Sequence, residues 1–122
     1  MRFVFARHGP YEKVSLRANQ RDKAKLSPLG VRQSELVGEF LRGNQVWPDS
    51  VLVNGKARSL QTAEIDLQTL GSPITPAVPK HTGFRSATVQ DRICEWFEET
   101  GLTSDQTLML VGSRPQMHSL VR

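Results

Sequence analysis

Basic and nucleophilic side chains follow three apolar segments of the sequence, each at the point where the segment ends. At these three places the chain carries Arg7, His8, Arg58, Ser113 and Arg114. Guanidinium groups hold the oxygens of a phosphoryl group through charge-assisted hydrogen bonds. A neutral imidazole between them can attack phosphorus, while the arginines stabilise the charge that develops. These residue types predict phosphoryl transfer through a phosphohistidine.

The segments that must position these residues alternate between strand and helix patterns. Short apolar runs predict a strand ending at Arg7, strands at 50–53 and 107–111, and a proline-flanked edge strand at 74–78. Helical spacing predicts helices at 28–43, 57–70, 86–100 and 116–122. Alternation of this kind indicates an α/β domain with a mainly parallel sheet and helices on both faces. The carboxyl ends of parallel strands share one edge, where ligands bind, so the three basic sites should converge there.

The first of these helices has strong local signals at both ends. Ser27 can cap the free backbone N–H groups, Pro28 suits the first helical position, and Gly43-Asn44 ends the helix. Apolar and amide side chains recur at steps of three and four residues along it. The face expected to pack on a core carries Leu29, Gln33, Leu36, Val37, Phe40 and Leu41.

Composition narrows the class of protein. A chain of 122 residues suffices for one domain, no apolar run approaches the ~20 residues of a membrane span, and no secretory leader precedes Arg7. A lone cysteine, Cys94, excludes an intrachain disulfide and a cysteine-based zinc site, so we expect a cytoplasmic protein. The net charge of +4 suits an acidic partner, but the basic residues are spread along the chain without interleaved aromatics, which disfavours nucleic acid.

Four segments together resemble the histidine phosphatase (phosphoglycerate mutase-like) superfamily, and most closely its short bacterial phosphohistidine phosphatases. Arg7-His8-Gly9 is similar to the family's Arg-His-Gly signature after strand one, and Leu26 to Gln33 is similar to its Leu-Thr-x-x-Gly-x-x-Gln helix start. Ala57 to Glu64 is similar to the family's Arg-x-x-Gln-Thr-Ala-Glu segment, and Leu110 to Pro115 is similar to its Val-Gly-His-x-Pro turn.

The resemblance implies a three-layer α/β/α sandwich and a metal-independent phosphatase without an organic cofactor. His8 would be the phosphorylated nucleophile, and Arg7 and Arg58 the phosphate clamps. The substrate would be phosphohistidine or a small phosphomonoester, so the partner is a phosphorylated small molecule or a phosphoprotein. Residues 1–122 would form a single domain that lacks the family's usual C-terminal strands, and an unpaired sheet edge would favour a homodimer.

Two departures from the family pattern leave an alternative open. Ser113 stands where the family has a second phosphate-binding histidine, and serine keeps a hydrogen-bond donor without the positive charge. Arg114 would restore that charge if it turned inward, whereas His118 is expected to be a helix-surface or partly buried histidine. The segment 80–85 has no carboxylate to act as general acid, which makes His81 a candidate acid or substrate contact. The alternative is a degenerate member that binds a phosphorylated ligand or protein without turnover.

Overall fold

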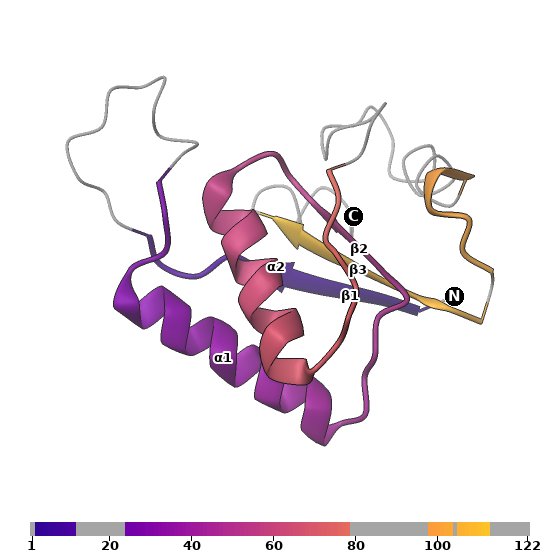
Figure 1. Cartoon of the computed structure of the whole chain (residues 1–122), viewed down its shortest axis with the longest axis horizontal. Helices are drawn as coiled ribbons and strands as arrows, with labels where there is room; N and C mark the ends of the chain where they lie inside the picture. The colour runs from indigo at the N-terminus through magenta and orange to yellow at the C-terminus, as the bar shows by residue number, and fades with distance from the viewer. Residues whose placement is uncertain (1, 12–23, 79–97, 104, 113–122) are drawn as a thin grey trace.

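The computed structural model describes residues 2–11, 24–78, 98–103 and 105–112, and the statements below concern these residues. Figure 1 shows two helices stacked on one side of a small sheet. In chain order the elements are β1 (Arg2–Arg7), α1 (Pro28–Gly43), β2 (Ser50–Val53), α2 (Ala57–Leu70) and β3 (Thr107–Gly112). None of the helices described is long and apolar enough to cross a membrane.

The three strands are all parallel, in the order β1-β3-β2, which confirms the parallel sheet expected from the sequence. The central strand β3 is buried along its whole length. At the carboxyl edge the backbone N–H of His8 donates to the Gly112 carbonyl at 3.1 Å, and that of Asn54 to the Val111 carbonyl at 3.2 Å. Backbone hydrogen bonds therefore hold the turns after β1 and β2 against the end of β3.

The two faces of the sheet bury different side chains, as the two-residue period of a strand requires. One face carries Val51, Val53, Met109 and Val111, which form a single cluster with Leu41 of α1 and with Ala63, Leu67 and Leu70 of α2. The opposite face carries Leu52, Leu108 and Leu110, against which Phe3 and Leu102 pack. Both faces are therefore apolar, as expected for an α/β sheet covered on each side.

The predicted buried face of α1 is wrong except at Leu41. The buried residues are Gly30, Ser34, Gly38 and Leu41. Leu29, Leu36, Val37 and Phe40 are between 37% and 66% exposed, and Gln33 is exposed as well. The reason is the close approach of α1 to α2: a Cβ on Gly38 would lie 2.6 Å from the Thr69 Cβ. Only the small-residue side of α1 fits there.

The helix ends agree with the sequence. The Ser27 Oγ accepts a hydrogen bond from the Gly30 N–H at 3.1 Å, and Pro28 is the first residue of α1. Gly71 ends α2 with φ 86°, and Gly101 has φ 68° after the helical residues 98–100. These left-handed conformations favour glycine.

The predicted edge strand 74–78 is wrong as a strand. It is reduced to one parallel bridge between Ala77 and β2, with the Val53 N–H donating to the Ala77 carbonyl at 2.9 Å. Pro73 and Pro76 have no N–H groups to extend this pairing. The predicted helix 116–122 and most of the helix 86–100 lie outside the described residues, as does Cys94.

Candidate active site

The turn that carries His8 is held by the first residues of α1. Both the N–H and the Oγ of Ser27 donate to the Pro10 carbonyl, at 2.9 and 3.1 Å. The two backbones also touch, because a Cβ on Gly30 would lie 2.1 Å from the Pro10 oxygen and one on Gly9 would lie 3.0 Å from the Gly30 Cα. Glycine at both positions lets α1 fix the turn in which His8 stands.

Arg58 reaches the same place from the first turn of α2. The preceding turn is set by the Asn54 side chain, which accepts a hydrogen bond from the Lys56 N–H at 3.2 Å. Arg58 is only 6% exposed, and its Nε donates to the His8 Nε2 at 3.3 Å. Its guanidinium carbon lies 4.3 Å from the centre of the Tyr11 ring, a cation–π geometry that further orients it.

The two ring nitrogens of His8 have different partners. Nδ1 lies 3.0 Å from the Gly9 carbonyl oxygen, which can only accept, so Nδ1 carries the hydrogen. Nε2 then carries the lone pair of the ring, and this lone pair accepts the hydrogen bond from the Arg58 Nε. Burial lowers the pKa of His8 from its ordinary value, and the charges of Arg58, Arg7 and Lys56 lower it further, against an opposing effect of the Gly9 carbonyl. The lowered pKa favours the uncharged form of the ring near neutral pH.

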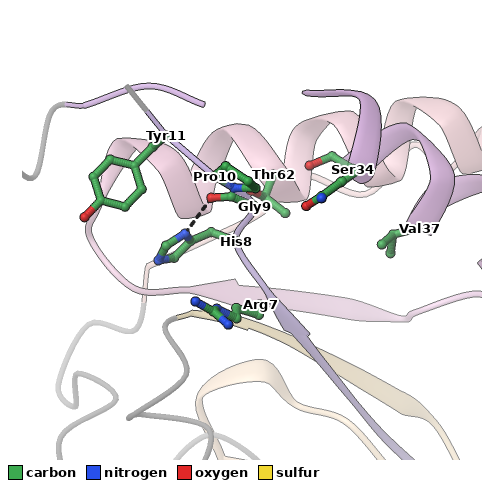
Figure 2. Close-up of a pocket in the computed structure, with 9 residues that line it drawn as sticks. Arg7, His8, Gly9, Pro10, Tyr11, Ser34, Val37 and Thr62 are labelled. Atoms are coloured by element: carbon green, nitrogen blue, oxygen red, sulfur yellow. Dashed lines mark hydrogen bonds between the residues drawn. The ribbon is translucent and has the colours of Figure 1, made fainter. Parts of the chain in front are cut away.

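The structure brings together three of the residues that the sequence analysis selected. Arg7, the last residue of β1, is paired in register with Gly112 and extends beneath the His8 ring in Figure 2. Together with Arg58 it places two cations beside the imidazole, an arrangement that can bind an oxyanion next to Nε2. The other candidates, Ser113, Arg114, His81 and His118, lie outside the described residues.

Sequence reasoning missed two residues of the site. Tyr11 is not among the site residues expected from the sequence, yet its ring meets that of His8 edge-on at 5.6 Å and lies under Arg58. The signal in the sequence that could have identified Tyr11 was an aromatic residue closely following His8. Gln61 was quoted only as part of a motif; its Oε1 accepts the Leu26 N–H at 2.8 Å and so ties α2 to the segment that leads into α1.

A pocket of about 460 Å³ opens beside these residues (Figure 2). Its lining comes from the end of β1, the turn that follows it, and both helices. The lining residues are Arg7, His8, Gly9, Pro10, Tyr11, Gln33, Ser34, Val37 and Thr62. In the described part of the chain no group of three or more His, Cys, Asp or Glu side chains could hold a metal ion.

Solved structures of phosphatases share this fold. No protein-family model and no curated protein sequence matches the chain. The protein histidine phosphatase SixA complexed with tungstate matches with a TM-score of 0.76 and 21% identity over 99% of this chain and 74% of its own. A protein described as the phosphohistidine phosphatase SixA of Agrobacterium tumefaciens gives 0.72 and 19%, over 98% and 72%.

A more distant match is the ecdysone phosphate phosphatase of Bombyx mori with tungstate, with a TM-score of 0.68 and 14% identity over 99% of this chain and 76% of its own. The chain therefore has the α/β fold of these phosphatases. That is the fold class predicted from the sequence.

Proposed function

We propose that this protein is a metal-independent phosphatase that works through a phosphohistidine at His8. The observation that carries the proposal is the state of His8: Nδ1–H is bound to the Gly9 carbonyl, and the Nε2 lone pair faces Arg58 at 3.3 Å. In the first step Nε2 attacks phosphorus, and the bond to the leaving group breaks with its electron pair, which takes up a proton from water. In the second step water attacks phosphorus, the P–N bond breaks, and inorganic phosphate leaves.

The two arginines supply the charge that these steps need. Arg58 is nearly fully buried, so its guanidinium acts where water screens it little. In the free enzyme one of its N–H groups satisfies Nε2, and when a phosphoryl group binds, the guanidinium instead holds the phosphoryl oxygens and releases the lone pair for attack. Arg7 holds the phosphoryl group from the end of β1.

Phosphohistidine or a small phosphomonoester is the proposed substrate class. Two of the structural neighbours are described as phosphohistidine phosphatases and a third as an ecdysone phosphate phosphatase. A phosphoramidate has a good leaving group and therefore needs little help from a general acid. This suits a chain in which segment 80–85 has no carboxylate.

Ser113 motivates a second candidate, a protein that binds phosphorylated ligands without turnover. In that case the missing histidine, and with it a positive charge, would leave the transition state too weakly stabilised. Ser113→His would then create or greatly raise activity, whereas a phosphatase that already works with serine would gain little.

Hydrolysis of p-nitrophenyl phosphate tests the proposal. His8→Ala should abolish turnover, and Arg58→Ala should lower kcat/KM by roughly 10²–10³-fold. Arg32→Ala is the matched control, because that arginine is more than half exposed on α1 and pairs with Glu39 at 3.8 Å. Intact-mass measurement of acid-quenched enzyme should show one added phosphoryl group in the wild type and none in His8→Ala. Turnover that survives His8→Ala would refute the proposal.

The pH profile gives a second readout. The attacking form of His8 is the neutral one, and its pKa is lowered from 6.5. The acid limb of kcat/KM should therefore fall below pH 6.5, and activity should be independent of this group above it. A limb centred above pH 6.5 would contradict the assignment.

A further inference from the structure

The pocket in Figure 2 reaches well beyond the residues that would hold a phosphoryl group. Arg7 and His8 lie at one end, and Val37 of α1 lies at the other. Its volume of about 460 Å³ is in the range of pockets that enclose organic ligands, roughly 300–1,000 Å³. The part of the pocket lined by Gln33, Ser34, Val37 and Thr62 is called the α1 end below.

The chemistry of the α1 end differs from that of the phosphate end. The Ser34 hydroxyl donates to the Gly30 carbonyl at 3.0 Å, and the Thr62 hydroxyl to the Arg58 carbonyl at 2.7 Å. Each hydroxyl has only one hydrogen, so neither has one left to donate to a ligand. Val37 adds an apolar surface.

Gln33 is the polar group of this end that keeps donors and an acceptor for a ligand. Its Oε1 lies 3.5 Å from where a Cβ on Gly9 would stand, directly beside the turn that carries His8. Among the residues that the structure describes, no charged side chain lines the α1 end. These residues offer no cation to a second phosphate or carboxylate and no carboxylate to an ammonium group, so either would lose its hydration there without compensation from them.

We infer, on the basis of the proposed function, that the α1 end takes the organic group that carries the phosphate and selects an uncharged, largely apolar one such as a ring. Val37 provides the apolar wall, and Gln33 hydrogen-bonds a neutral polar atom of that group. These two are specificity residues: neither touches the His8 Nε2, and both decide which phosphorylated molecule is held in front of it.

Binding of two phosphonates that differ only in their organic group tests this inference without requiring turnover. Isothermal titration calorimetry is carried out with phenylphosphonate and with methylphosphonate, which share the anionic head. The wild type should bind phenylphosphonate about tenfold more tightly or better, because the ring is buried at the α1 end. Val37→Trp fills that end and should bring the ratio of the two affinities close to one, with methylphosphonate affinity changed less than about twofold.

Leu36→Trp is the matched control. Leu36 is the neighbouring residue on α1, is 47% exposed and does not line the pocket. Leu36→Trp should keep the wild-type ratio of the two phosphonate affinities, and circular dichroism should show that both tryptophan variants are folded. The inference is overturned if the wild type does not prefer phenylphosphonate, if it binds neither ligand, or if the two tryptophan variants behave alike.

The outcome separates this inference from the proposed function. The protein could prefer phenylphosphonate, lose that preference in Val37→Trp, and yet hydrolyse no phosphomonoester. This result would support the inference about the α1 end and refute the proposed phosphatase activity. Hydrolysis that depends on His8, with a ratio unaffected by Val37→Trp, would give the opposite result. For an active enzyme the same variant should raise KM for aryl phosphates.

Discussion

Replacing Gly30 with alanine tests whether α1 holds the turn that carries His8. The new Cβ would lie 2.1 Å from the Pro10 oxygen and 3.2 Å from the Leu26 Cβ and Cδ2. Contacts below 3.0 Å do not persist in proteins, so the turn must move by roughly 1 Å. The carbonyl that must move is the one that accepts both hydrogen bonds from Ser27.

The cost follows from these contacts. Overpacking of a fitted site costs about 1–3 kcal/mol, and each weakened hydrogen bond about 0.5–1.5 kcal/mol. The higher helix propensity of alanine offsets about 1 kcal/mol of this cost. With two hydrogen bonds affected, we therefore expect Gly30→Ala to lower the free energy of unfolding by about 1–5 kcal/mol. A shift of about 1 Å at His8 should also reduce kcat/KM by up to roughly 100-fold.

Urea denaturation and phosphatase assays of the same preparations measure both effects. Gly43→Ala is the control, since it adds the same methyl group at the other end of α1 where nothing lies within 4 Å. Gly43→Ala should leave the free energy of unfolding unchanged or raise it by up to about 1 kcal/mol, because only the difference in helix propensity remains. If the two alanine variants are equally stable and equally active, the close contact between α1 and the turn does not support His8.

Two further predictions concern stability. Leu41→Ala should cost about 2–4 kcal/mol in urea denaturation, whereas Phe40→Ala should cost less than about 0.5 kcal/mol, because Leu41 is 3% exposed and Phe40 is 66% exposed; equal costs would contradict the packing of α1. Asp66 is fully buried without a hydrogen-bond partner, and burial raises its pKa to about 8, so the carboxyl is neutral in the folded chain and ionised in the unfolded chain above about pH 4. Wild-type stability should therefore fall by about 2–5 kcal/mol between pH 4 and pH 8, and Asp66→Asn should remove that slope; an identical slope in both proteins would refute the assignment.

The strands β1, β2 and β3 and the helix ends could be predicted because their signals are local. Pro28 and Gly71 act through the backbone of their own turn, and β3 is a continuous apolar run. The convergence of Arg58 with His8 also followed from a general rule, since parallel strands end at one edge of a sheet.

The buried face of α1 could not be predicted in the same way. Apolar periodicity identifies the side of a helix that could be buried, whereas the contact with α2 decides which side is buried. That contact is made close by Gly38, whose Cβ would meet both Thr69 and the Asp66 carbonyl. The tautomer of His8 and the position of Tyr11 likewise depend on hydrogen bonds and ring contacts formed only after folding.

Some residues of the four family-like segments stabilise the fold, whereas others would carry out the proposed chemistry, and the contacts show which residues stabilise the fold. Gly30 permits the contact between α1 and the turn, and Gln61 joins α2 to Leu26. Thr62 closes a hydrogen bond to the Arg58 carbonyl within its own helix. A protein that kept these contacts would keep the fold whether or not it transferred phosphate.

The proposed phosphoryl transfer depends on fewer atoms. It needs a nitrogen lone pair, which the His8 Nε2 provides because its Nδ1–H is bound to the Gly9 carbonyl. It also needs cations within reach of the oxygens on the attacked phosphorus, and Arg58 donates directly to that nitrogen. Substitution of His8 should therefore abolish turnover, and substitution of Arg58 should lower kcat/KM by roughly 10²–10³-fold, in a chain that still folds. Substitution of Gly30 or Gln61 should reduce turnover only as far as it destabilises the fold or displaces His8.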